Sequence, residues 1–473
     1  MTVRALLAAA ALAAAFTARA DLDPASRQLA HDILKQLVEI NTADSVGNVT
    51  TAAEALAQRF RDAGFPEKDI SILSANDKRK NLVVRLHGNG RKKPILMIGH
   101  LDVVEARRED WNTDPFQFIE KDGYYYGRGT QDMKDGVTIE ALTLIRLHKE
   151  GYHGDRDLIA AFTAGEESGL DNGVDWLTKH HMELIEAEFA LNHDGPSLYA
   201  VKGKPAYLEI DASEKVYADF QLSVANPGGH SSVPTSDNAI YHLALALNRL
   251  AAYEFPFELN AVTRAYYESM AKSEQGDRAA NIRGMLASSP DPEAIKRLSR
   301  DSIDHATTHT TCVATRLEGG HANNALPQMA RAVVNCRILP GHEPEAVREE
   351  LIRVFADPKV AVRYIGEGGE ILETAESKHG FSAPVLRKDV VDATHRIAGE
   401  MWPGLPIVPM MSAGASDAVY ANAAGLPTYQ VTGELIDRDD VRAHGQDERI
   451  GVEAFYRGAE FHYRFIKELT ARR

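Results

Sequence analysis

Hydrophobic and polar positions change period several times between Asp21 and Ser213. Apolar residues spaced three or four apart predict helices, and they recur in residues 52–60, 137–147 and 174–179. Short apolar runs between polar or glycine residues predict strands buried on both faces, and they occupy residues 81–86, 94–98 and 158–162. Strands that alternate with helices predict an α/β layer with a largely parallel sheet.

A different pattern begins near Glu214. Strands are predicted at residues 218–224, 310–316, 331–339 and 361–365, and helices at 239–250 and 343–355. The mostly polar stretch 255–309 is predicted to be helical. From about Ala375 the α/β pattern resumes, with a helix at 386–398. We therefore predict an α+β domain at 214–374, inserted between two parts of an α/β domain at 21–213 and 375–473.

Composition narrows the classes of function. The chain has 473 residues, of which 44% are hydrophobic and 26% charged, as is ordinary for a globular protein. Lys and Arg total 53 against 68 acidic residues, a net charge of −15, and an acidic surface disfavours nucleic acid as a partner. Cys312 and Cys336 are too few for a Cys-rich zinc site, so any metal must be held by His, Asp and Glu.

Residues 1–20 have the layout of a secretory signal peptide. Arg4 precedes an apolar run from Ala5 to Phe16, and Ala18 and Ala20 supply small residues for cleavage. After this segment no stretch reaches the ~18 apolar residues that a membrane helix needs, so we expect no stable membrane anchor. We expect an exported protein, secreted or periplasmic.

Acidic and histidine side chains follow three of the predicted strands. Directly after these strands come His100 with Asp102, Glu166 with Glu167, and His193 with Asp194. A glycine-rich segment at 127–132 lets the backbone come close and ends at Asp132. Sites in open α/β sheets lie beyond the carboxyl ends of the strands, so we expect these side chains to meet at one edge.

Such a cluster has the ligand chemistry of a divalent metal site. Imidazole and carboxylate groups suit catalytic zinc, which keeps an open position for water, although cobalt or manganese accept similar ligands. The residues that we predict as ligands are His100, Asp132, Glu167 and Asp194. Asp102 is expected to orient the ring of His100, and Glu166 is a natural general base.

Three segments together resemble metallopeptidase family 20, the group of aminoacylases, glutamate carboxypeptidase, succinyl-diaminopimelate desuccinylase and carboxypeptidase S. The segments are Gly99–Val104, Gly127–Gly136 and Thr163–Gly169. The resemblance extends over nearly all of the chain after residue 20, and the long insertion before Thr310 is most similar to the carboxypeptidase S branch. It implies a phosphorylase/hydrolase-like α/β catalytic domain with two Zn²⁺ and an inserted α+β lid domain of the dimerisation type.

The resemblance also assigns the metal ligands. Asp132 corresponds to the carboxylate that bridges the two zinc ions. His100 and Asp194 correspond to the other ligands of one ion, and Glu167 and the C-terminal His444 correspond to those of the second.

Roles for the residues beside these ligands follow in the same way. Glu166 matches the catalytic base of the family, and Asp102 matches the acid that supports His100. His193 competes with its neighbour Asp194 as a ligand, and the family pattern favours Asp194.

The inserted block resembles the lid of the family. Within Gly228–Pro234, His230 matches the histidine that stabilises the oxyanion of the tetrahedral intermediate, often in the active site of a partner subunit. From the residues alone, a histidine in a surface loop is the other interpretation. Asn324 and Arg337 match an asparagine and an arginine that bind the substrate carboxylate, for which an arginine fork is well suited.

A turn that contains Gly414 and Ser416 resembles the turn that faces the substrate in the family. The usual hydroxyl-rich version of this turn is altered here, which leaves the specificity open.

The implied function is that of an exported di-zinc hydrolase cleaving an amide bond beside a free carboxylate, as a carboxypeptidase acting on short peptides. An N-acyl amino acid deacylase needs the same groups and stays an alternative. A metal- or peptide-binding protein without catalysis is a third interpretation. Relatives dimerise through the lid, so a homodimer is expected unless the insertion at 255–309 replaces that interface. Cys312 and Cys336 fall on two predicted strands, and the sequence leaves their pairing open.

Overall fold

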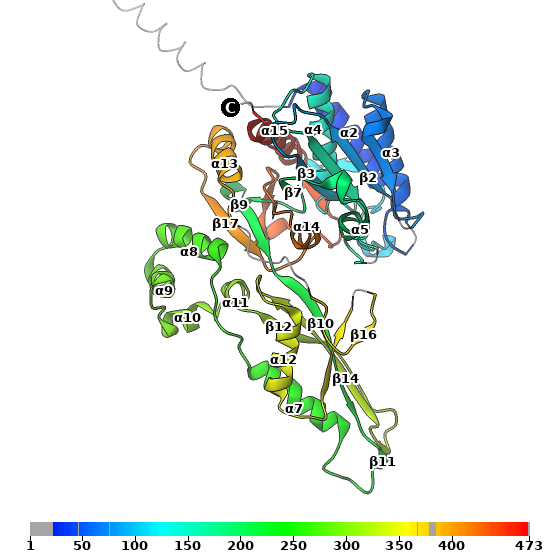
Figure 1. Cartoon of the computed structure of the whole chain (residues 1–473), viewed down its shortest axis with the longest axis vertical. Helices are drawn as coiled ribbons and strands as arrows, with labels where there is room; N and C mark the ends of the chain where they lie inside the picture. The colour runs from blue at the N-terminus through cyan, green and yellow to red at the C-terminus, as the bar shows by residue number, and fades with distance from the viewer. Residues whose placement is uncertain are drawn as a thin grey trace, which may run out of the picture.

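The computed structural model describes residues 22–45, 47–74, 76–169, 171–201, 203–366, 368–377 and 385–471. The predicted signal peptide, residues 1–20, lies outside the described residues. Figure 1 shows one body built around a sheet that contains β3 (Ile95–His100) and a second body that extends from it and contains β10 (Val216–Ala225). No helix within the described ranges is long and apolar enough to cross a membrane.

The main sheet of the first body is largely parallel. In spatial order its strands are β1 (Ile70–Leu73), β2 (Asn81–Leu86), β6 (Leu158–Thr163), β3, β7 (Phe189–Asn192) and β18 (Thr428–Tyr429). The strands from β6 to β18 run parallel to one another, whereas β2 is antiparallel to both β1 and β6. The predicted α/β class is confirmed, and the strand predicted at 81–86 is the one that runs in the opposite direction.

Alternate residues of these strands face two layers of helices. Met97 of β3 belongs to the core that contains α3 (Val49–Asp62) and α4 (Lys134–Lys149), whereas Leu96 belongs to the core that contains α5 (Gly173–His180). The other helices of this body are α2 (Pro24–Glu39), α6 (Met182–Ile185), α13 (Lys388–Met401), α14 (Ala418–Ala423) and α15 (Val452–Leu469). Burial on both faces explains why the strands are apolar throughout.

Two smaller sheets complete the first body. In spatial order they are β17 (Ile407–Ser412), β9 (Lys204–Glu214), β8 (Leu198–Val201) and β19 (Leu435–Asp437), and β20 (Arg449–Gly451), β5 (Tyr124–Tyr126) and β4 (Ile119–Lys121). Short 3-10 helices are η1 (Glu67–Asp69), η2 (Arg108–Asp110) and η3 (Arg438–Asp440). β9 leads into β10 of the second body through the single residue Lys215.

The second body is an antiparallel sheet with helices against it. In spatial order its strands are β12 (Thr311–Gly319), β14 (Met329–Ile338), β10, β15 (Ala361–Ile365) and β16 (Ile371–Leu372). Leu243 of α7 (Ala239–Ala252) and Leu351 of α12 (Pro344–Phe355) are buried against this sheet. A separate ribbon pairs β11 (Gly229–His230) with β13 (Ala325–Leu326). This is the α+β lid architecture that the fold class predicted, and the proposed domain boundaries stay predictions.

The polar stretch 255–309 is helical but lies against the first body. Its helices are α8 (Ala261–Ser273), α9 (Gly276–Leu286), α10 (Pro292–Leu298) and α11 (Ser302–Thr308). They have a small core of their own around Tyr267 and Ile282. α8 contacts β17, and Val262 joins the main core of the first body (Figure 1). The insertion therefore packs on the first body, and Glu258 at its start reaches His342 of the second body, 2.9 Å from Nε2.

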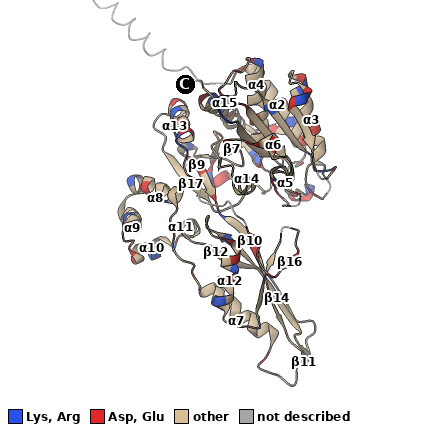
Figure 2. Ribbon diagram, viewed as in Figure 1, with Lys and Arg blue, Asp and Glu red and all other residues tan. Residues whose placement is uncertain are grey.

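The outer helices carry charges of both signs. In the view of Figure 2, Lys and Arg alternate with Asp and Glu on α3, α8 and α13. These helices therefore carry mixed charge.

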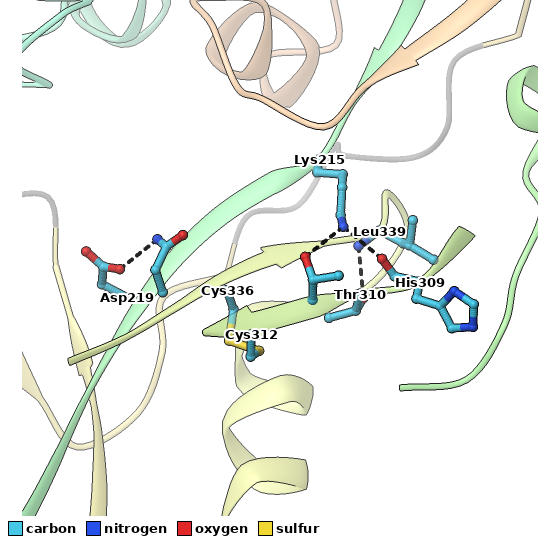
Figure 3. The surroundings of a disulfide bond; sticks show 9 residues. Lys215, Asp219, His309, Thr310, Cys312, Cys336 and Leu339 are labelled. Carbon is cyan, nitrogen blue, oxygen red and sulfur yellow. Dashed lines mark hydrogen bonds between the residues drawn. A yellow bond between two sulfur atoms is a disulfide. The ribbon is translucent and has the colours of Figure 1, made fainter. Parts of the chain in front are cut away.

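A disulfide of the second body and the buried lysine of the crossing strand lie near the junction between the bodies. Cys312 of β12 lies directly opposite Cys336 of β14, and the two form a disulfide, which settles the pairing that the sequence left open. Lys215 Nζ donates to the carbonyl oxygen of His309 at 2.7 Å (Figure 3). It also donates to the carbonyl oxygen of Ala306 at 2.9 Å. The lysine thereby ties the crossing strand to the end of the helical insertion.

Candidate metal centre and active site

Three neighbouring strands end at one edge of the main sheet, each followed by predicted site residues. β3 ends at His100, β6 leads to Glu166 and Glu167, and β7 leads to Asp194. Because β3 pairs in parallel with both β6 and β7, these ends lie side by side. Asp132 reaches the same edge from the loop before α4.

The predicted ligands form two sets that share Asp132. His100 Nε2 lies 3.1 Å from Asp132 Oδ1 and 3.8 Å from Asp194 Oδ1. His444 Nε2, from the loop between η3 and β20, lies 3.0 Å from Asp132 Oδ2 and 3.1 Å from Glu167 Oε2. Asp132 presents one oxygen to each set, which is the geometry of a carboxylate that bridges two cations.

Several buried atoms of this cluster have no hydrogen-bond partner among the described residues. They are His100 Nε2, Asp132 Oδ1 and Glu167 Oε1. The close contact between His100 and Asp132 does not have hydrogen-bond geometry. Leaving such an atom unpaired costs about 1–3 kcal/mol, so orphaned atoms of this kind are rare. Imidazole nitrogen and carboxylate oxygen are zinc ligands, and the residues present therefore fit divalent cations.

The acidic groups of the cluster are crowded in a buried place. Burial raises the pKa of Glu166 well above its ordinary value, against the opposing field of His100, and Asp194 adds to the rise. Burial acts in the same direction on Asp132, but His100 and His444 outweigh it and hold the pKa of that carboxyl below its ordinary value. The acids outnumber the histidines, so bound cations would offset the excess negative charge.

Comparison with known proteins agrees with this fold. The sequence description of peptidase family M20/M25/M40 matches residues 96–468. The chain belongs to this family. Its members are metal-dependent hydrolases, and this M20 protein is a metal-dependent peptidase or amidohydrolase.

Similar proteins carry two kinds of name. Probable carboxypeptidase S-like 2 of Dictyostelium discoideum is 27% identical over 389 residues, which are 79% of this chain and 71% of that protein. The N-fatty-acyl-amino acid synthase/hydrolase PM20D1 of Homo sapiens is 27% identical over 384 residues, which are 79% of this chain and 74% of that protein. The M20 family metallo-carboxypeptidase Sso-CP2 from Sulfolobus solfataricus has the same fold, with a TM-score of 0.69 at 18% identity, covering 95% of this chain and 100% of that one.

In this M20 protein Asp102 contacts the site through both its main chain and its side chain. The carbonyl oxygen of Asp102 lies 3.0 Å from His100 Nδ1, whereas the carboxylate is 3.8 Å from that atom. The carboxylate instead accepts the backbone N–H groups of Glu166 at 3.3 Å and Glu167 at 3.0 Å. The backbone of Asp102 therefore orients the ring, and its side chain holds the residues predicted as base and ligand.

The structure separates the two candidates that follow β7. Asp194 lies in one set with His100 and Asp132. The ring of His193 is buried on another side, where Nε2 lies 2.8 Å from Glu434 Oε1. Since the hydrogen-bonded nitrogen of His193 points to Glu434, the geometry favours Asp194 as the ligand.

Two buried acids that the sequence did not reveal hold segments of the site by hydrogen bonds. Glu448 Oε1 accepts the backbone N–H groups of Gly129 at 3.1 Å, Gln131 at 2.7 Å and Asp132 at 3.2 Å. Asp417 accepts from Thr163 Oγ1 at 2.9 Å at the end of β6. Glu448 lies four residues after the predicted ligand His444, and this spacing is a signal that could have found it, whereas Asp417 is recognisable only from its contacts.

The residues predicted to bind substrate do not all lie at the cluster. The lining of a cavity of about 590 Å³ includes Glu166, Glu167, Arg337, Ser416 and His444. The hydroxyl of Ser416 donates to Glu214 Oε1 at 2.6 Å and accepts from Asn192 Nδ2 at 2.9 Å, so it braces the turn.

Three other predicted residues lie outside that cavity. Gly414 is exposed in the turn before Ser416. His230 and Asn324 are exposed beside the β11–β13 ribbon, which Figure 1 shows at the far end of the second body. Within one chain the fold therefore does not bring His230 or Asn324 to the metal ligands.

Proposed function

We propose that this M20 protein is an exported di-zinc hydrolase that cleaves an amide bond beside a free carboxylate, as a carboxypeptidase acting on short peptides. The observation that carries the proposal is one cavity whose lining includes Glu167 and His444 of the cation-binding cluster together with Arg337. An arginine fork binds a planar carboxylate bidentately, so it can place the neighbouring amide at the cluster.

His100, Asp132 and Asp194 would hold one zinc ion, and Asp132, Glu167 and His444 would hold the second. When bound, the cations polarise the scissile carbonyl and acidify water near neutral pH. Glu166 is the general base: its carboxylate lies in the cluster, 3.9 Å from His100 Nε2, and belongs to neither of these two ligand sets. It removes a proton from the attacking water and returns it to the leaving nitrogen. The carboxylate of Asp102 holds Glu166 by accepting the backbone N–H of Glu166.

The position of His230 favours a homodimer as the active form. Its ring is exposed on β11, far from the metal ligands of its own chain (Figure 1). β12 is an edge strand whose exposed side chains include Val313 and Leu317, and α7 beside it exposes Tyr241 and Leu245. An open edge with apolar residues beside it suits pairing with a second copy, which would bring the partner's His230 to the oxyanion.

Export rests on residues 1–20 alone, whose charge, apolar run and small residues have the layout of a signal peptide. Edman sequencing of the protein recovered from the periplasm or medium should begin after Ala20. Full-length protein retained inside the cell would contradict export and leave the catalytic proposal untouched.

Names among the relatives support a second candidate, an N-acyl amino acid deacylase, because PM20D1 is named for N-fatty-acyl amino acids. The protein from residue 21 onward, reconstituted separately with zinc, cobalt and manganese, should be assayed on blocked dipeptides and on N-acyl amino acids. Release of free amino acid from the dipeptides supports the carboxypeptidase, and release only from N-acyl amino acids supports the deacylase. No release from either panel would favour a binding protein.

A further inference from the structure

Two neighbouring strands of the second body bring an acidic and a basic side chain to the substrate cavity. Tyr217 of β10 lies opposite Arg337 of β14, and Asp219 lies opposite Asn335. Tyr217, Asp219 and Arg337 all line the cavity that reaches Glu166 and the other residues of the cluster. Since residues two apart on a strand share a face, Asp219 and Arg337 present opposite charges to one space.

Arg337 is oriented by an aromatic ring and has no acidic partner in the described chain. Its guanidinium lies over the ring of Tyr217, 4.7 Å from the centroid. Stacking of this kind fixes the plane of the guanidinium and leaves its N–H groups able to bind a carboxylate. The side chain is therefore prepared for an anionic group of the substrate.

Asp219 is oriented by two hydrogen bonds. It accepts the hydroxyl of Tyr217 at Oδ2, 2.6 Å away, and the amide of Asn335 at Oδ1, 2.8 Å away. Figure 3 shows Asp219 on β10, beyond the disulfide. Both partners are neutral, and no Lys, Arg or His among the residues described forms an ion pair with it. A half-buried carboxylate with two neutral donors still attracts a cation.

We propose that Asp219 selects a leaving amino acid whose side chain carries a cation, as lysine, ornithine or arginine does. The inference rests on the proposed function, in which Arg337 binds the carboxylate of that amino acid. Its α-nitrogen belongs to the scissile amide and is uncharged, so the cation must come from the side chain. Diagonal positions on paired strands are about 7–8 Å apart, a distance that a side chain of three or four carbons spans.

The test compares leaving residues that differ in charge but little in length. The zinc-loaded enzyme is assayed with N-acetyl-alanyl-lysine, N-acetyl-alanyl-norleucine and N-acetyl-alanyl-(Nε-acetyl)lysine, and with the corresponding N-acetyl amino acids. These two series cover both scissile groups considered above. We expect kcat/KM for lysine to exceed that for norleucine about ten- to a hundredfold, the range of a charge-assisted hydrogen bond.

Asp219→Asn keeps the size of the side chain and removes its charge, so it should lower kcat/KM for lysine about ten- to a hundredfold and thereby abolish the preference for lysine over norleucine. Asp237→Asn is the matched control, because Asp237 pairs with Lys359 on the surface and does not line the cavity. It should keep the preference. Metal content and thermal unfolding of both variants are measured, since a purely structural role for Asp219 would lower stability without changing the ratio of the two substrates.

The results of these assays distinguish the role of Asp219 from the proposed function. Hydrolysis without a preference for lysine, or a preference that survives in Asp219→Asn, overturns the role of Asp219 and leaves the proposed function standing. Absence of hydrolysis for every substrate in both series overturns the proposed function itself.

Discussion

The residues at the edge of the main sheet and those of the lid are positioned at the active site in different ways. His100, Glu167 and Asp194 follow parallel strands that are hydrogen-bonded to one another, so their positions depend on a single sheet. Arg337 and His230 belong to the second body, which β10 joins to the first through Lys215. Arg337 lines the cavity, whereas His230 lies at the far end of the same body. The positions of these three ligands thus depend on one sheet, whereas completion of the site depends on how the second body is placed against the first.

The sharpest way to test the sheet edge is Glu166→Gln. It should lower kcat about 10²–10⁴-fold, the usual contribution of a general base, and leave the metal content unchanged. Activity is measured on the best substrate of the panel and metal by atomic absorption. Glu186→Gln, which alters an exposed acid paired with Lys93, is the control and should behave as wild type. Near-normal turnover of Glu166→Gln would remove the base from the mechanism.

The lid side of the comparison is tested by His230→Ala, which should lower kcat about 10²–10³-fold, as loss of an oxyanion donor does. Mixing this variant with Glu166→Gln after unfolding and refolding together distinguishes the origin of His230. If it acts on the partner, mixed dimers regain one intact site each, about one quarter of the wild-type activity for a symmetric dimer. No recovery in a sample shown to contain mixed dimers would place His230 in its own site or outside catalysis.

Removal of the disulfide should affect the lid and spare the sheet edge. Cys312 and Cys336 are separated by 24 positions, and opening a loop of this length costs the lid about 3 kcal/mol in the chain-entropy account. Hydrogen exchange in the Cys312→Ser, Cys336→Ser double variant should rise in β12 and β14. Exchange in β3 and β6 should stay as in wild type, and equal loss of protection in both sheets would show that the bodies unfold as one unit.

The smallest expected effect concerns the residue that joins the bodies. Burial lowers the pKa of Lys215 from 10.5 to about 7, and Arg337 acts in the same direction. Between these values the unfolded chain binds a proton that the folded chain does not, so the free energy of unfolding rises with pH in that window. Allowing for relaxation, the rise is of order 2 kcal/mol.

Urea unfolding of wild type and Lys215→Met between about pH 7 and pH 10 measures this contribution. The wild type should gain stability relative to the variant as the pH rises. Below about pH 7 the difference between the two proteins should become constant, because the lysine is then protonated in both states. A constant difference over the whole range would mean that Lys215 keeps its charge through its three hydrogen bonds.

Residues next to strand ends were predictable because a short apolar run determines where a buried strand stops. The segments after β3, β6 and β7 were identified in this way, and the structure brings His100, Glu167 and Asp194 together. The direction of β2 was not predictable, since its run of apolar residues reads the same in either orientation. Asp417 was missed for a similar reason: an acid in a loop has no pattern, and only its contact with Thr163 reveals its position.

The sequence by itself determined the α/β class, the ligand chemistry and the segments that carry it, because period, residue type and motif spacing are local properties. Only the tertiary structure decided that the main chain of Asp102 orients His100, that His193 pairs with Glu434, and that Cys312 bonds to Cys336. It also separated Arg337, which lines the cavity, from His230 and Asn324, which do not. Each of these outcomes depends on strand register or on the placement of one body against another, and neither is encoded in any short stretch of the chain.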